Sequence, residues 1–169
     1  MITIDTREKP ADYVARLLKV LGDGSKVGTL RAGDYLFCSC SGSVHSPKYH
    51  TLVERKRVGN LVSSFYHRVA SGRRELADQL GRCKEDADRV VLLVEGDCRP
   101  GLDPSSLFAE GFRRKMAYVA LQGILLSLQH ELGVEVLWTA DVEATIAVIA
   151  WLDDYLRKPQ HGGWFKEVQ

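Results

Sequence analysis

Three consecutive residues, Glu54, Arg55 and Lys56, have side chains suited to cleaving a phosphodiester bond. They end a short run, Thr51 to Val53, whose composition predicts a β-strand. Side chains two apart on a strand point to the same face, so we expect Glu54 and Lys56 to project together and Arg55 to the other side. A carboxylate can hold a divalent cation, and an ammonium beside it can steady an attacking water or a pentavalent phosphate. The competing interpretation is a solvated strand face with an ordinary ion pair.

A second carboxylate is predicted close to Glu54. The Gly33-Asp34 pair indicates a turn that leads into a strand at 35–37. If this strand forms a hairpin with the strand that ends at Lys56, Asp34 lies near Glu54. Two carboxylates would then converge on one cation.

A third acidic group lies near the N-terminus. Apolar and polar residues alternate over 2–4, which predicts a strand, and Asp5 ends it. Arg7 and Glu8 follow, where they could reach a site at the edge of the sheet. The alternative for Asp5 is a structural one, as the cap of a helix that begins near Pro10.

Together these motifs resemble the nuclease domain of the XPF/MUS-type structure-specific endonucleases, a group that includes archaeal Hef. The order of Asp, a long gap and Glu-x-Lys is also the skeleton of the PD-(D/E)XK nucleases. The resemblance extends over nearly the whole chain, through Asp5-Thr6-Arg7-Glu8, Gly33-Asp34, Val53-Glu54-Arg55-Lys56, Ser71-Gly72-Arg73, Gln79, and the apolar runs 90–96 and 134–138.

The resemblance implies an α/β fold, a single PD-(D/E)XK-type nuclease domain in which helices flank a central mixed β-sheet. It also implies a divalent-metal-dependent endodeoxyribonuclease that uses Mg²⁺ or Mn²⁺ and cleaves branched, flapped or nicked DNA during repair or recombination. Asp34 and Glu54 would bind the cation, and Asp5 would assist directly or through water. Lys56 would orient the nucleophilic water or neutralise charge in the transition state.

Basic residues near the motifs are expected to contact phosphate. Arg7 and Arg55 would hold carboxylates and phosphate in place, and Glu8 would support Arg7. Glu95, at the end of an apolar run, is either a further acidic ligand or a structural partner of Arg73. A solvated helix face is the competing interpretation for each basic cluster. We expect DNA-backbone contacts from Arg57, Arg73 and Arg74.

Asn60 stands where the family usually has Asp. An amide can accept a hydrogen bond but brings no negative charge, which leaves open a non-catalytic DNA-binding subunit that pairs with an active relative. Retention of the carboxylates and the lysine favours the enzyme. A further alternative is a Holliday-junction resolvase or restriction-type nuclease that shares only the PD-(D/E)XK core. The motif at 5–8 favours the XPF-like branch.

The composition is typical of a globular domain, with 169 residues, 45% of them hydrophobic and 27% charged, and a net charge of +1. Such a small net charge places DNA binding on local basic patches. Neither a membrane span nor a signal peptide is predicted, so we expect a cytoplasmic location, or the nucleoid or nucleus, wherever the DNA is. The segment 39–50 holds Cys40, His45 and His50 but matches no standard zinc finger, and we expect a solvated hairpin tip.

The domain is expected to span 1–158 and to be followed by a mobile tail at 159–169. Apolar periodicity predicts a last helix at 142–156 that is apolar on more than one face. One apolar stripe suffices for a surface helix, so the extra apolar face indicates a partner. We therefore expect a homodimer built from the C-terminal helices, unless this helix lies deep in its own fold. The other predicted helices end near residues 22, 72, 86 and 133, and the other strands lie around 26–30, 34–40, 51–56, 90–95 and 134–138.

Overall fold

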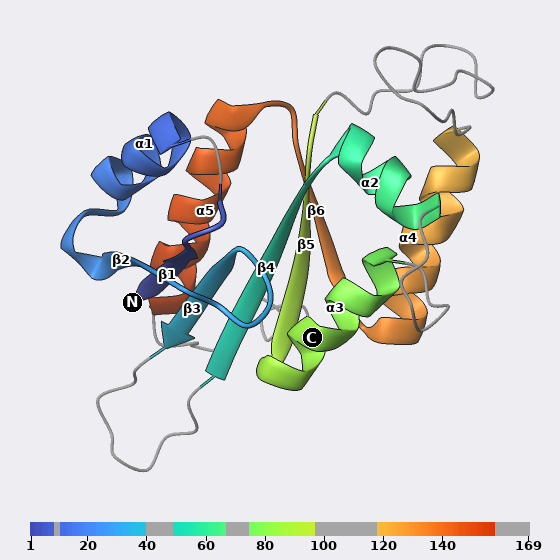
Figure 1. Cartoon of the computed structure of the whole chain (residues 1–169), viewed down its shortest axis with the longest axis horizontal. Helices are drawn as coiled ribbons and strands as arrows, with labels where there is room; N and C mark the ends of the chain where they lie inside the picture. The colour runs from blue at the N-terminus through green and yellow to red at the C-terminus, as the bar shows by residue number, and fades with distance from the viewer. Residues whose placement is uncertain (9–10, 40–48, 67–74, 97–117, 158–169) are drawn as a thin grey trace, which may run out of the picture.

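A six-stranded mixed sheet forms the centre of the domain (Figure 1). The computed structural model describes residues 1–8, 11–39, 49–66, 75–96 and 118–157. Within them the strand order is β2-β1-β3-β4-β5-β6. β3 runs antiparallel to both β1 and β4, whereas β1 with β2, and β4 with β5 and β6, are parallel. The strands are β1 (Ile2–Asp5), β2 (Ser25–Gly28), β3 (Tyr35–Ser39), β4 (Tyr49–Arg57), β5 (Arg89–Glu95) and β6 (Glu135–Thr139).

Helices cover both faces of the sheet. α1 (Ala11–Leu21) and α5 (Val142–Arg157) lie on one side, and α2 (Val58–Tyr66), α3 (Glu75–Asp86) and α4 (Tyr118–Leu132) lie on the other (Figure 1). Each face has its own apolar core. The prediction of an α/β domain with a central mixed sheet flanked by helices is therefore confirmed. None of the helices in the described ranges combines the length and apolarity that a membrane crossing requires.

The central strand β5 joins the two cores. Val90, Leu92 and Val94 belong to the core under α2, α3 and α4, and Val91 and Leu93 to the core under α1 and α5. A strand buried on both faces has a continuous apolar sequence rather than an alternating one, which is why the run was recognisable. Truncating Leu92 or Leu93 to alanine should cost about 2–5 kcal/mol of stability.

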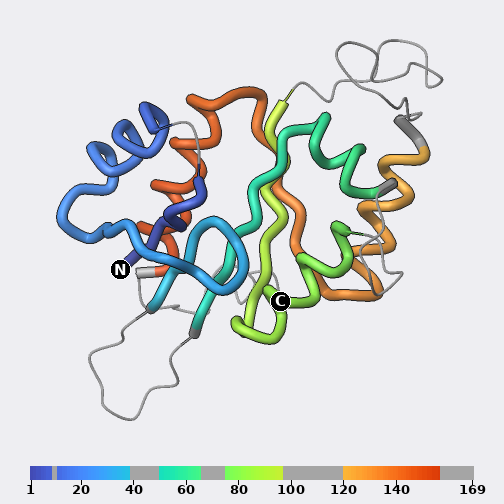
Figure 2. The backbone as a smooth tube through the Cα atoms, in the orientation of Figure 1, coloured from blue at the N-terminus to red at the C-terminus, as the bar shows by residue number. Residues whose placement is uncertain are grey.

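The β3–β4 hairpin brings the acidic motifs together. Tyr35 pairs with Val53, and the backbone N–H of Asp34 donates to the Val53 carbonyl over 2.8 Å. The segment 29–34 consequently lies against β4 (Figure 2). Gly33 has a φ of +74°, and a Cβ there would come within 2.9 Å of a Leu52 methyl group. A glycine is needed at this position to let the turn approach the strand.

Some predicted boundaries differ from those observed. The strand expected around 26–30 ends at Gly28 and pairs with β1 at the edge of the sheet. The residues from 29 onward turn away to form the approach to Asp34. The first half of the helix expected between 105 and 133, the break at 72, and the tail at 159–169 lie outside the described residues.

Candidate active site

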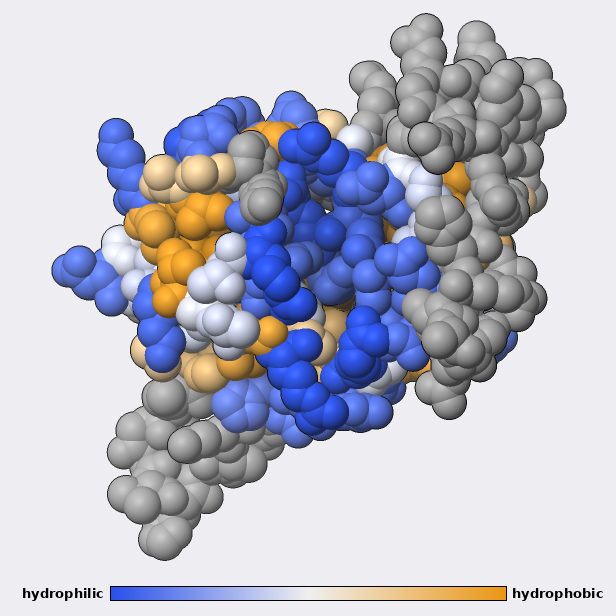
Figure 3. Space-filling view, viewed as in Figure 1, coloured by the Kyte–Doolittle hydropathy of each residue, from blue (hydrophilic) through white to orange (hydrophobic). Residues whose placement is uncertain are grey.

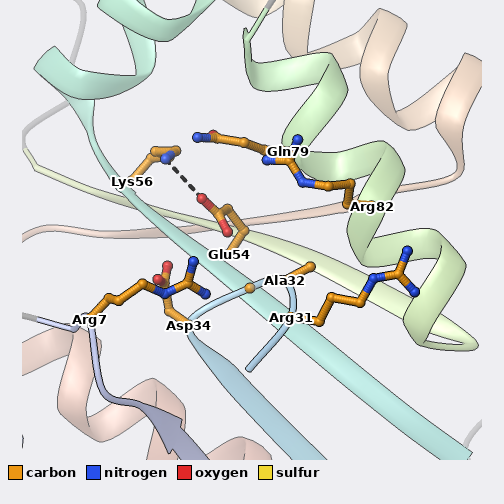
Figure 4. A pocket seen from close by; sticks show the side chains of 9 residues that line it. Arg7, Arg31, Ala32, Asp34, Glu54, Lys56, Gln79 and Arg82 are labelled. Carbon is orange, nitrogen blue, oxygen red and sulfur yellow. Dashed lines mark ion pairs between the residues drawn. The ribbon is translucent and has the colours of Figure 1, made fainter. Parts of the chain in front are cut away.

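The carboxylates of Asp34 and Glu54 line one pocket. Asp34 immediately precedes β3, Glu54 lies within β4, and the hairpin register sets them side by side. The pocket lies on the sheet face that α3 covers, beside the segment that precedes Asp34 (Figure 4). Its lining consists of Arg7, Arg31, Ala32, Gly33, Asp34, Glu54, Lys56, Gln79 and Arg82.

Glu54 and Lys56 project from the same face of β4. The Lys56 Nζ lies 2.8 Å from Glu54 Oε1, and the two side chains are 16% and 9% exposed. Such limited contact with water makes this ion pair stronger than a pair on an open surface. The arrangement places an ammonium directly beside one of the two carboxylates.

Asp34 is held in position by the backbone. Its Oδ2 accepts a hydrogen bond from the Arg55 N–H over 2.7 Å. Burial and the nearby negative charge of Glu54 nevertheless raise the pKa of Asp34 to about 7, since that single hydrogen bond and Lys56 only partly offset them. The two carboxylates therefore repel each other when both are ionised.

This pair of carboxylates fits a divalent cation. Mg²⁺ and Mn²⁺ prefer oxygen ligands, and Mg²⁺ is commonly bound through one or two carboxylates plus water and substrate phosphate. A cation between Asp34 and Glu54 would relieve the repulsion that raises the pKa of Asp34. Among the described residues no group of three or more His, Cys, Asp or Glu side chains could hold a metal ion, so water and substrate would have to complete the coordination of a cation at this pair.

Positive charge surrounds the carboxylates. Arg7, Arg31 and Arg82 line the pocket together with Lys56. Arg31 also pairs with Glu85 and Asp86, and Arg82 pairs with Asp78, so acidic groups on α3 hold both side chains. Hydrophilic residues form a band across this face of the molecule (Figure 3). The arginines and Lys56, rather than hydrophilicity as such, are the groups that suit the phosphates of a nucleic acid.

Comparison with known proteins identifies the family. Residues 4–152 match the model of the ERCC4 domain. The chain belongs to the ERCC4 domain family. Among solved structures, XPF from Aeropyrum pernix matches with a TM-score of 0.64 and 23% identity, over 91% of this chain and 63% of that one. XPF from Aeropyrum pernix in complex with DNA matches with a TM-score of 0.61 and 24% identity, over 96% of this chain and 69% of that one.

The predicted XPF-type nuclease domain is thereby confirmed at the level of family and fold. The chain spans less than two thirds of the first of these structures. No match was found among curated proteins.

The other face of β4 in this ERCC4 domain carries a buried ionic cluster in which Arg55 pairs with Glu8 and Glu95. The cluster shows that one prediction is wrong. Glu8 does not support Arg7. Its Oε1 accepts from Arg55 over 2.5 Å and from the Tyr35 hydroxyl over 2.9 Å. Arg55 also donates to both oxygens of Glu95 and lies 4.4 Å from the Tyr13 ring centroid. Burial lowers the pKa of Arg55, but the hydrogen bonds to Glu95 outweigh it, so the guanidinium remains charged.

Glu95 and Arg57 belong to this cluster rather than to the pocket. Arg57 Nε donates to Glu95 over 3.2 Å, and the Thr145 hydroxyl donates to the same carboxylate over 2.8 Å. Glu95 is therefore a structural partner of Arg55 and Arg57, and not a further ligand at the pocket. Arg57 is 56% exposed, but it faces away from the carboxylates beside which its phosphate contact was expected.

Asp5 positions Arg7. Oδ1 accepts from the Arg7 backbone N–H and from Arg7 Nε, each over 2.7 Å. Oδ2 accepts from Arg7 Nη2 and from the Leu30 N–H. Burial raises the pKa of Asp5, but these hydrogen bonds outweigh it and hold the pKa below its usual value. All four of its acceptor positions are occupied, so the arrangement favours a positioning role over the expected direct help with a cation.

Three polar side chains of the pocket were absent from the predicted site. Gln79 appeared only through the resemblance, and Arg31 and Arg82 were not singled out. Arg82 lies three residues after Gln79 on α3, so a helical turn places both on one face, and this spacing could have indicated it. Arg31 is three residues before Asp34 in an irregular segment, where the spacing of residues does not indicate which way a side chain points.

The remaining predicted residues lie elsewhere or outside the described ranges. Asn60 is an exposed residue on α2 and does not line the pocket. Arg73 and Arg74 lie outside the described residues, as do Cys40 and His45. At the base of the same hairpin, Cys38 Sγ lies 3.4 Å from His50 Nδ1.

Proposed function

We propose that this ERCC4 domain is a DNA endonuclease that depends on Mg²⁺ or Mn²⁺. The observation that carries the proposal is the pair of adjacent carboxylates, Asp34 and Glu54, with Lys56 at 2.8 Å from one of them and arginines around the rim. Two acidic ligands, one ammonium and a basic rim are the components that metal-assisted phosphodiester hydrolysis requires.

In the proposed reaction Asp34 and Glu54 would hold the cation, which would supply a water of lowered pKa and stabilise the charge that develops on phosphate. Lys56 hydrogen-bonds the attacking water or the phosphate oxygen that gains charge. Asp5 keeps Arg7 at the rim, where its guanidinium binds a neighbouring phosphate. No side chain forms a covalent intermediate.

We infer that the substrate is branched, flapped or nicked duplex DNA of the kind formed in repair or recombination. One of the similar structures is a complex with DNA, and the rim of the pocket offers arginines that suit phosphate. Arginine contacts to the backbone carry no sequence information, so the enzyme should select its substrate by shape. Asn60, the residue that suggested a non-catalytic subunit, is exposed and off the pocket, and it therefore favours no second function.

We also propose that two copies associate through the C-terminal helices. On α5 the residues Ile146, Ile149 and Leu152 are buried, whereas Trp151 is 55% exposed and stacks on Tyr155 with 5.2 Å between ring centroids. A large exposed aromatic pair on a helix that already buries one apolar face suits a second copy of the chain. Light scattering should give a mass above 18.9 kDa, and Trp151→Glu should return the monomer without unfolding it. A monomer at every concentration would contradict the dimer.

The test of the nuclease is digestion of labelled single-stranded, duplex, flap, fork and four-way DNA with Mg²⁺ and with Mn²⁺. The expected result is metal-dependent cleavage that Glu54→Gln abolishes while DNA binding stays within a few-fold. Glu131→Gln, the same change at an exposed position on α4, is the control and should cleave normally. Cleavage by folded Glu54→Gln at the wild-type rate would overturn the site.

A further inference from the structure

Gln79 lines the pocket and has a buried amide oxygen. Its Oε1 is inaccessible to water and has no hydrogen-bond partner within the described residues. Gln79 Nε2 donates to Glu75 Oε1 over 3.4 Å, one turn earlier on α3, which sets which end of the amide is the acceptor. The terminal amide points toward Lys56 across the pocket (Figure 4). A buried hydrogen-bond acceptor without a donor destabilises the protein, unless a donor reaches it when the site is occupied.

Binding of a cation would also affect the ion pair of Lys56. Its ammonium now lies on Glu54 Oε1, at 2.8 Å, and this carboxylate is also a proposed cation ligand. A cation and an ammonium compete for the same negative charge, so a cation that binds through Oε1 would displace Lys56 from Glu54. With only 16% of its side chain exposed, Lys56 then needs another acceptor, because an unpaired ammonium in such a place is costly.

We propose that Gln79 is a positioning residue whose Oε1 accepts the Lys56 ammonium when a cation occupies Glu54. The inference rests on the proposed metal-dependent nuclease and adds to it an exchange between two acceptors. Lys56 pairs with Glu54 in the metal-free protein and with Gln79 in the metal-bound protein. The exchange keeps the ammonium in the pocket beside the reacting phosphate and frees the carboxylate.

Calorimetric titration of Mg²⁺ into four proteins tests the exchange: wild type, Gln79→Leu, Lys56→Met and the double variant. Gln79→Leu should weaken Mg²⁺ binding roughly five- to tenfold, since one hydrogen bond to a charged group is lost. Lys56→Met should bind Mg²⁺ at least as tightly as wild type, because the competitor for Glu54 is gone. In the Lys56→Met background, Gln79→Leu should change the affinity less than about twofold, because no ammonium remains to be moved.

Further variants separate this role from others. Gln79→Glu keeps an acceptor at the same place and should retain at least the wild-type affinity. Gln79→Leu should lower kcat while the KM for DNA stays nearly constant, because substrate binding does not use the amide. Gln129→Leu, the same change at an exposed position on α4, should behave as wild type, and thermal denaturation confirms that each variant is folded.

Two results would overturn the exchange. Equal weakening by Gln79→Leu with and without Lys56 would show that Gln79 is a direct ligand or a structural residue. Unchanged affinity in folded Gln79→Leu would show that Lys56 does not need it. If wild type binds no Mg²⁺, or Glu54→Gln binds it as tightly as wild type, the proposed metal site fails, and the exchange fails with it.

Discussion

Successive residues of β4 place charged side chains on opposite faces of the sheet, and the two faces differ in how these charges are paired. On one face Arg55 is 6% exposed and is bound by Glu8 at 2.5 Å and by Glu95 at 2.7 Å. On the other face Glu54 and Lys56 pair with each other, while Asp34 next to them has a raised pKa. The first set of charges is matched within the protein. In the second set, burial and the charge of Glu54 leave Asp34 with a raised pKa although basic side chains line the same pocket.

This contrast separates structure from function more clearly than residue type does. A buried ionic cluster whose groups are all paired serves the structure. Here it connects Glu8, which follows β1, with Arg55 on β4 and Glu95 on β5. Two buried carboxylates that repel each other destabilise the fold. Such pairs are found at functional sites, where a bound ligand can offset the repulsion.

Asp34→Asn should lower Mg²⁺-dependent DNA cleavage roughly a thousandfold, because it removes one of two acidic ligands. The same change should make the metal-free protein more stable at pH 8, by about 1 kcal/mol or more, because the repulsion with Glu54 disappears. Cleavage assays and urea denaturation of the same preparation measure both effects. A variant that is both inactive and less stable would show that Asp34 serves the fold.

Arg55→Met should lower the free energy of unfolding by about 3–5 kcal/mol, because it leaves buried Glu8 without its arginine and buried Glu95 with the exposed Arg57 alone. Arg57→Met is the matched control. It removes an arginine that shares the partner Glu95 but is 56% exposed, so its effect should stay below about 1 kcal/mol. Similar losses in the two variants would mean that burial of the cluster does not determine its contribution.

The stability of the metal-free protein should fall as the pH rises from about 4 to about 7. Across this range folded Asp34 still holds a proton, because its pKa is raised to about 7, whereas the unfolded chain has released it. The folded state therefore binds more protons, and raising the pH favours unfolding. Asp34→Asn should lack this component, so the stability difference between variant and wild type should grow with pH. A constant difference would contradict the raised pKa.

Asn60→Asp is expected to have the smallest effect. The added charge should tighten Mg²⁺ binding, but from an exposed position off the pocket it is screened, and we expect a change of no more than about twofold. Calorimetric titration of both proteins measures it. A tenfold gain would show that α2 turns this side chain toward the cation.

Most of the fold could be predicted from the sequence because its strands have distinct patterns. The apolar run of β5 indicates a strand buried on both faces, and Gly33-Asp34 marks the turn into β3. Strand alternation also places Glu54 and Lys56 together and Arg55 apart, as the structure shows. These features depend on local periodicity, which a sequence displays directly.

The partners of the charges could not be predicted in the same way. Glu8 was assigned to Arg7, its neighbour in sequence, but it binds Arg55, which is 47 residues away. Glu95 was assigned to Arg73 or to the pocket, and it binds Arg55 and Arg57 across the β4–β5 ladder. Such pairings depend on strand order and on how the loop after β1 runs, and neither is encoded in the spacing of the residues concerned.

The most direct test of the proposed cation site is an X-ray experiment on crystals grown with Mn²⁺, in which anomalous scattering locates the cation. We expect one strong peak within bonding distance of a carboxylate oxygen of Asp34 and of one from Glu54, with the Lys56 ammonium displaced from Glu54. A map without a peak there, or with Mn²⁺ bound only at other carboxylates, would contradict the claim that this face of β4 is a cation site.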